Sequence, residues 1–223
     1  VVTLTKLALA EDLEGQWARM SRLYDQLKGY FWGSEYLAVA ALAIVDMAEP
    51  ERDGDIVYRT RIIYERMKRV HPFLTTGEDS AFAALLAMSP LDDQAIEEEM
   101  EWCYKTLKPS FFSGNAVQSL SQVLALGERA AEEKCARVLA IYDCLFSQGY
   151  KYGKGYELPS LGALALLDED VESLAADMMA ADDYTRAVKG FCPCGIGTRK
   201  RLMYAGSLTM EARLPVVQTM PSA

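Results

Sequence analysis

The stretch Tyr64-Glu-Arg-Met67-Lys68 decides the fold, because versions of it recur along the chain at nearly constant intervals. The tyrosines that head these stretches are Tyr24, Tyr64, Tyr104, Tyr142 and Tyr184, at intervals of 40, 40, 38 and 42 residues. A period of this length is typical of stacked supersecondary units. The sequence therefore predicts about five tandem units of roughly 40 residues each.

Each unit has the pattern of two helices. Around the tyrosine, apolar residues such as Ile63 and Met67 fall at helical spacing with charged residues between them. A break with aromatic residues and glycine follows, as in Phe31-Trp-Gly33. An alanine-rich second helix then begins, for example around Leu42-Ala43. Because its apolar residues lie nearly all round, we expect the second helix to be buried.

The fold class that follows is all-α. No strand-length alternation of β-branched and polar residues occurs, and no Asn-Gly or Asp-Gly turn joins two such runs. We expect about five αα-hairpins stacked as an open, curved α-solenoid, and a partly closed α/α toroid is the alternative. We expect residues 1–223 to form a single domain. The chain starts at Val1 rather than Met, which indicates a processed chain or a fragment of a longer one.

Composition limits the partners. The 223 residues include 23 Lys and Arg against 32 Asp and Glu, a net charge of -9 that repels nucleic acid and anionic lipid. The longest apolar runs fall well short of the roughly 20 residues of a membrane-spanning helix. We therefore expect neither nucleic acid nor membrane as a partner. The five cysteines match no disulfide framework, which favours a cytoplasmic location.

The first candidate site is the break that contains His71, the only histidine of the chain. Glu78 and Asp79 are close to His71 in sequence, and a carboxylate beside a histidine is typical of an oriented general base. The structural interpretation is stronger, because His-Pro ends a helix, Thr75 and Glu78 have the spacing of a capping box, and no nucleophile accompanies the histidine. We predict no catalytic residue here.

The second candidate lies in the last unit. Gly195-Ile-Gly197-Thr198-Arg199-Lys-Arg201 puts glycines, a hydroxyl group and cations at a predicted helix start, where a phosphate or carboxylate can bind. The P-loop order is absent, and a solvated basic first turn explains the pattern better. Cys192-Pro-Cys194 offers two thiolates for zinc, but no second pair of ligands has finger spacing, so no metal site is predicted.

The acidic clusters around Asp92, Glu97 and Asp168 fall in connectors and first helical turns. Solvated carboxylates stabilise helix starts there, so we assign them no site. The repeated tyrosines are likewise expected to pack between units rather than to bind a ligand.

The segment Ile63-Tyr-Glu-Arg-Met-Lys-Arg-Val-His71-Pro-Phe-Leu-Thr-Thr-Gly-Glu-Asp-Ser-Ala-Phe-Ala-Ala-Leu-Leu-Ala87 carries a family resemblance, with Leu139-Ala-Ile-Tyr142-Asp143 and Leu164-Ala-Leu-Leu167 later in the chain. It resembles the bacterial domain-of-unknown-function family numbered 4003, over most of the chain. The resemblance implies a bacterial, cytoplasmic protein that is a fragment or trimmed form of a longer one. It implies no catalytic residue.

Two functions remain after these exclusions. The first is a non-enzymatic helical-repeat scaffold that binds a protein or peptide, or another copy of itself. The second is an enzyme or small-ligand binder of the α/α-toroid class, which would use the loops before the second helix of each pair. For that case the candidate ligand-loop residues are His71, Glu78, Asp79, Thr198, Arg199 and Arg201. No cofactor and no metal is predicted for either.

Overall fold

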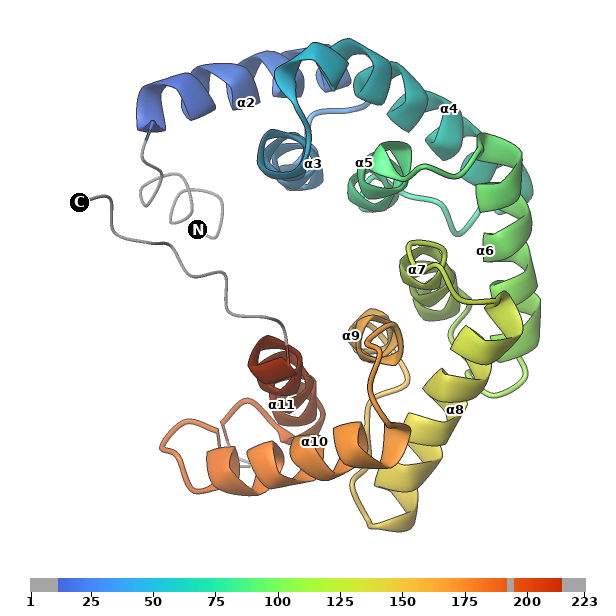
Figure 1. Cartoon of the computed structure of the whole chain (residues 1–223), viewed down its shortest axis with the longest axis vertical. Helices are drawn as coiled ribbons and strands as arrows, with labels where there is room; N and C mark the ends of the chain where they lie inside the picture. Colours follow the sequence, from blue (N-terminus) through green and yellow to red (C-terminus); the bar gives the residue numbers. More distant parts are fainter. Residues whose placement is uncertain (1–11, 192–194, 214–223) are drawn as a thin grey trace.

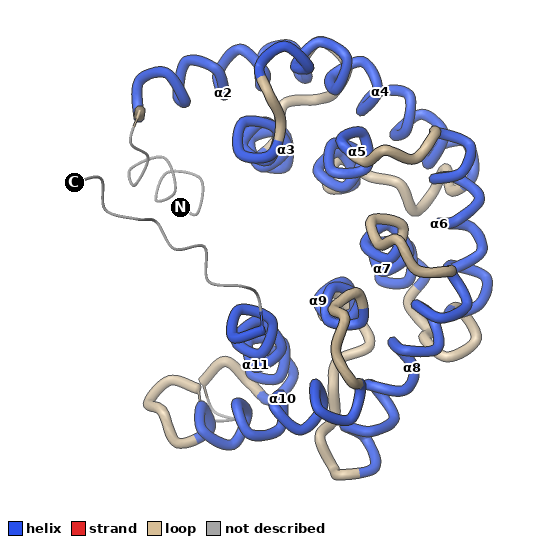
Figure 2. Tube along the Cα trace, in the orientation of Figure 1, coloured by secondary structure: helices blue, strands red, loops and turns tan. Residues whose placement is uncertain are grey.

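The computed structural model describes residues 12–191 and 195–213. Within these two ranges all regular secondary structure is helical and no strand occurs (Figure 2). The predicted all-α class is therefore confirmed. None of the helices described is long and apolar enough to cross a membrane.

The helices alternate between an outer and an inner layer (Figure 1). The outer helices are α2 (Leu13–Lys28), α4 (Asp53–Val70), α6 (Asp93–Leu107), α8 (Ala131–Ser147) and α10 (Val171–Arg186). Each contains one of the repeated tyrosines. The short 3-10 helix η1 (Pro50–Arg52) leads into α4. At the start of α6 the side chain of Asp92 accepts hydrogen bonds from the N–H groups of Gln94 and Ala95, as an acidic helix cap does.

The inner helices are seen nearly end-on in Figure 1. They are α3 (Glu35–Met47), α5 (Asp79–Met88), α7 (Gly114–Leu124), α9 (Leu158–Ala165) and α11 (Thr198–Arg213). Small residues such as Ala40 and Ala83 lie on their buried faces and allow close packing. Burial is not all round, contrary to the sequence-based expectation. Val39 and Met47 on α3 are 48% and 65% exposed, because no helix of the described residues covers the inner side of this layer.

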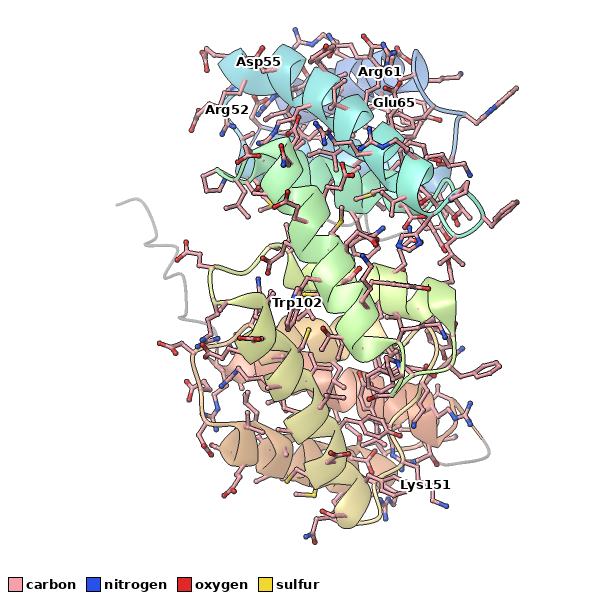
Figure 3. The ribbon with its side chains drawn as sticks, turned by 90° about the vertical axis from the view of Figure 1, so that its right-hand side faces the viewer. Arg52, Asp55, Arg61, Glu65, Trp102 and Lys151 are labelled. Carbon is pink, nitrogen blue, oxygen red and sulfur yellow. The ribbon has the colours of Figure 1, made fainter. Side chains whose placement is uncertain are left out.

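The helix pairs follow one another around an arc, and among the helices described strong contacts join only those of the same pair or of adjacent pairs. The arc leaves a gap between α2 and α11 (Figure 1). Loops from outer to inner helices lie at one edge, and the return connections lie at the opposite edge. Figure 3 shows both edges, with Arg52 and Asp55 marking the return side and Lys151 the other side.

Two of the repeated tyrosines, Tyr64 and Tyr142, pack against phenylalanine rings of the preceding unit. The ring of Phe31, in the break after α2, meets Tyr64 of α4 edge-on with centroids 4.9 Å apart. Phe111, in the break after α6, meets Tyr142 of α8 in the same way at 5.4 Å. These contacts explain the spacing of the tyrosines as a packing requirement.

A second repeated feature joins the units from the other edge. Arg59 of α4 donates hydrogen bonds to the carbonyl oxygens of Ala87 and Ser89 at the end of α5, and it pairs with Asp93 at the start of α6 at 2.7 Å. Arg19 of α2 makes the equivalent contacts one unit earlier. Each arginine thus satisfies helix-terminal carbonyls and fixes the start of the next outer helix.

The buried apolar residues form two clusters. The first extends from α2 to the beginning of α6 and includes Leu23 and Leu86. The second extends from the end of α6 to α11 and includes Leu120 and Leu161. A group of buried polar residues, described next, lies where α5 meets α7 and the two clusters adjoin.

Candidate functional site

His71 ends α4, and its ring lies against α6. The ring centroid is 4.4 Å from that of Tyr104, and Nε2 lies 2.6 Å from Oε1 of Glu101. Phe31 and Phe111 occupy the equivalent positions of the neighbouring units. His71 therefore takes the place of an inter-unit packing ring and adds a polar contact to Glu101.

The sequence-based expectations for the neighbours of His71 need correction. The carboxylate beside the imidazole is Glu101 from the next outer helix, rather than Glu78 or Asp79. The capping box also does not form, because Glu78 stands at the N-cap of α5 without a side-chain cap bond and Thr75 accepts a bond from Gln118 instead. Both residues are engaged by α7, which the sequence pattern did not place next to this loop.

Asp79 is buried, with 1% of its surface exposed. Its Oδ2 accepts a hydrogen bond from the N–H of Thr76 at 2.6 Å, and its Oδ1 accepts from Nε2 of Gln122 at 2.7 Å and of Gln118 at 3.4 Å. Burial raises the pKa of the Asp79 carboxyl group despite these donors. We call Thr75, Asp79, Gln118 and Gln122 the polar seam, since they join α5 to α7 between the two apolar clusters.

A small cavity adjoins the polar seam. Its volume is about 10 Å³, and it is lined by Gln118 and Gln122 of the seam together with His71, Glu101 and Met67. The Oε1 atoms of both glutamines are buried and have no hydrogen-bond partner among the described residues. A space of this size holds a single water-sized group, whereas substrate pockets typically measure 300–1,000 Å³. His71 therefore borders a space too small for a substrate.

Glu78, next to Asp79 in sequence, faces the opposite side of α5. Its Oε1 accepts a hydrogen bond from Nδ2 of Asn115 on α7 at 3.0 Å. Its negative charge is also the main cause that raises the pKa of Tyr36 on α3. Glu78 thus lies on the inner side of α3, α5 and α7, while Asp79 joins α5 to α7 from the opposite side.

The inner side of these helices forms a groove of about 480 Å³, which we call the inner groove. It is lined by Tyr36 and Val39 of α3, Phe82 of α5, and Tyr156 and Pro159 at the start of α9, with Glu78 and Asn115 between them. Among the described residues that line it, Glu78 is the only charged one. The inner groove is therefore apolar and aromatic, with a single carboxylate.

Exposed aromatic rings lie in the loops at the start of the groove-forming helices. Trp32, Phe73 and Phe112 precede α3, α5 and α7, and each is at least 95% exposed. Exposed rings of this kind are common at recognition surfaces and are costly to leave in water. None of the three rings is among the described residues that line the inner groove.

The candidates in the last unit lie elsewhere. Thr198 and Arg199 begin α11, which is at the far end of the arc from α5 (Figure 1). Arg201 is buried and pairs with Asp182 through two hydrogen bonds of 2.7 and 3.1 Å, and it also donates to the carbonyl of Phe191. Its guanidinium group is therefore already occupied. The two sets of predicted ligand-loop residues do not form one site.

The described part of the chain contains no group of three or more histidine, cysteine or acidic residues arranged to hold a metal ion. Cys192 and Cys194, for which zinc was considered, lie outside the described residues. The acidic residues assigned no site have structural contacts: Asp92 caps α6, and Glu97 pairs with Arg66 and Arg69.

The geometry defines an all-helical protein of paired outer and inner helices with an apolar inner groove. The chain belongs to the family described as "Protein of unknown function (DUF4003)", whose model matches residues 1–221. It is similar to the "Uncharacterized protein YeaA" of Bacillus subtilis (strain 168), with 31% identity over 109 residues. That match covers 48% of this chain and 32% of the relative, so less than half of the relative's length is represented. No solved structure matches the chain.

Proposed function

We propose that this protein is a non-enzymatic helical-repeat scaffold that binds a segment of another protein in the inner groove. The observation that carries the proposal is the groove itself, about 480 Å³ in volume and open along α3, α5, α7 and the start of α9. An extended segment laid across these helices would contact several pairs at once, as in other repeat proteins. We place the protein in the cytoplasm, in keeping with the free, buried thiols of Cys103 and Cys135.

Side-chain chemistry supports a polypeptide as the occupant. Tyr36, Phe82 and Tyr156 supply ring surfaces in the groove, and aromatic residues are enriched where proteins bind one another. Tyr156 is 60% exposed, so its ring is available to a partner. Ser119 and Asn115 on α7 add polar groups that suit the backbone of a bound segment.

We propose that the helix pairs act as about five repeats in an open, curved α-solenoid. The support is that strong contacts join only same or adjacent pairs, and that the arc has a gap between α2 and α11. The curvature is strong, and a partly closed α/α toroid remains the alternative architecture. In either case the inner groove faces the concave side.

The enzyme alternative has less support. The space beside His71 measures about 10 Å³, and the ring is packed on Tyr104 and bonded to Glu101. Its loop and the Thr198 loop belong to helix pairs at different ends of the arc. An active site needs its catalytic groups to converge on a space that holds the substrate.

The test is selection of binding peptides from a random displayed library, followed by affinity measurement with two variants. Ser119→Trp fills the inner groove, and Ser147→Trp places the same bulk on the exposed end of α8 as a control. We expect peptides in the micromolar range, weakened at least about tenfold by Ser119→Trp and unchanged by Ser147→Trp. Failure to select any peptide, or equal binding by both variants, would overturn the proposal.

A further inference from the structure

We infer that the inner groove selects a polypeptide segment by a basic side chain, Arg or Lys, which binds Glu78 between the rings of Tyr36 and Tyr156. This inference rests on the proposed function and adds the chemistry of the partner. It follows from the charge in the groove, the rings around it and the absence of any basic group among the residues that line it.

The first step concerns the carboxylate. Glu78 is held in place by Asn115, whose Nδ2 occupies Oε1 at 3.0 Å, and no described basic residue forms an ion pair with it. Its negative charge raises the pKa of the Tyr36 phenol on α3. A fixed carboxylate in a groove without a basic neighbour favours a cationic group from the partner.

The second step concerns the rings. Tyr36, Phe82 and Tyr156 line the same groove as Glu78. The flat guanidinium of arginine and the ammonium of lysine are attracted to aromatic faces, and arginine combines that attraction with a forked bond to a carboxylate. The molecule uses such contacts itself, since Nζ of Lys154 lies 4.9 Å from the centre of the Tyr142 ring.

The helix starts beside the groove bring a charge of the opposite sign to that of Glu78. The inner helices α3, α5 and α9 begin beside the groove, and their N-terminal ends carry partial positive charge. Each already has its own acid: Glu35 and Asp79 lie in the first turns of α3 and α5, and Glu157 stands at the N-cap of α9. Ser113 caps α7 through its hydroxyl group. Glu78 itself stands at the N-cap of α5, where the helix start favours its ionised form, and no described basic side chain pairs with it.

The chain's own nearby cation is engaged elsewhere. Lys154, two residues before Tyr156, lies over the rings of Phe111 and Tyr142 and donates to the carbonyl of Ser110. It does not line the inner groove. The basic group must therefore come from outside the described part of the chain.

The experiment measures binding of four acetylated peptides, Ala-Leu-Xaa-Leu-Ala with Arg, Lys, Gln or Glu as Xaa, to the full chain by NMR titration at low salt. Arginine amide alone is a fifth probe. The variants are Glu78→Gln, which keeps an acceptor for Asn115, and Glu78→Lys, which reverses the charge. Thermal melts of the two Glu78 variants check that they remain folded.

We expect the parent to bind the Arg and Lys peptides at least about fivefold more tightly than the Gln peptide. Glu78→Gln should remove this preference, and Glu78→Lys should favour the Glu peptide. If all four peptides bind with equal affinity and Ser119→Trp still blocks binding, the preference for a basic side chain is overturned. The peptide-binding function then still stands. If no peptide binds in this titration and none is selected from the library, the preference for a basic side chain and the peptide-binding function are both overturned. If arginine amide binds as tightly as the Arg peptide, the inference that a polypeptide supplies the cation is overturned.

Discussion

His71 stands at a position where two neighbouring units have phenylalanine, and this substitution has local consequences. Its ring keeps the contact with the next tyrosine, Tyr104, while Nε2 gains the carboxylate of Glu101. The polar contact lies at the rim of the small cavity, next to the glutamines of the polar seam. The histidine is therefore best explained as part of a polar inter-unit joint rather than as a catalytic base.

The residues of that joint could be predicted only in part from the sequence. His71, Glu78 and Asp79 were identifiable as polar residues in a short break. Gln118 and Gln122 lie four residues apart on the apolar helix α7, a spacing that marks them as one polar face, and both are buried. The spacing of the two glutamines does not indicate which loop they face, because that depends on how adjacent helix pairs stack.

The pH dependence of stability should reveal the burial of Asp79. Burial raises its pKa above the ordinary 3.8, so above pH 3.8 and up to the folded pKa the native state binds more protons than the unfolded chain. The free energy of unfolding therefore falls as the pH rises through that interval, by at most about 1.4 kcal/mol per unit. Asp79→Asn lacks this titration, so the difference between parent and variant should shrink as the pH rises from about 4. Urea denaturation across a pH series measures it.

Asp92→Asn is the matched control, with the opposite sign. The N–H groups of Ala95 and Gln94 lower the pKa of Asp92, so its contribution is present above pH 3.8 and is lost as the pH falls through the folded pKa. Its difference from the parent should shrink toward low pH. A constant difference for Asp79→Asn across the series would contradict a buried, titrating Asp79.

The helices themselves were largely predictable, because each has its own periodicity, caps and charged ends. The break between outer and inner helices was equally visible from its aromatic residues and glycine. The break after α8 differs from the others, because Gly149 stands where they have a packing ring. The next tyrosine, Tyr184, has no such ring to pack against and is 76% exposed. The polar contacts between units escaped prediction, above all those of the arginines five residues before Tyr24, Tyr64 and Tyr142, since a single charged residue in an amphipathic helix normally reads as solvated.

The inter-unit arginine should contribute more to stability than an exposed one. Arg59→Leu removes donors from the carbonyls of Ala87 and Ser89 and leaves Asp93 unpaired, which should lower the free energy of unfolding by about 1–3 kcal/mol. Hydrogen exchange should rise most at the end of α5. Denaturation and exchange mass spectrometry check both.

Arg61→Leu is the control, two residues further along α4. Arg61 and Glu65 form an exposed pair on the outer helix (Figure 3), with side chains 42% and 54% exposed. Such pairs contribute about 0–1 kcal/mol. Equal losses for Arg59→Leu and Arg61→Leu would show that the arginine contacts at the return edge do not stabilise the stack.

The arrangement of the two apolar clusters bears on the cooperativity of the whole chain. The outer helix α6 contributes to both clusters, and the polar seam joins α5 to α7 beside this boundary. Hydrogen bonds from Gln118 and Gln122 to Asp79 join the two inner helices at this boundary. With strong contacts limited to adjacent pairs, the stability of one half depends on the other mainly through this boundary.

Two leucine-to-alanine substitutions, one in each cluster, should therefore act locally. Leu86 of α5 and Leu161 of α9 are both fully buried, and each truncation should cost about 2–5 kcal/mol. Exchange mass spectrometry resolved by peptide should show Leu86→Ala increasing exchange in α3 to α5 more than in α9 to α11, and Leu161→Ala the reverse. The comparison is between the two halves within each variant, so unequal total destabilisation does not affect it. A uniform rise along the chain in both variants would mean that the helix pairs unfold as one unit, and that the polar seam couples the clusters as firmly as an apolar contact does.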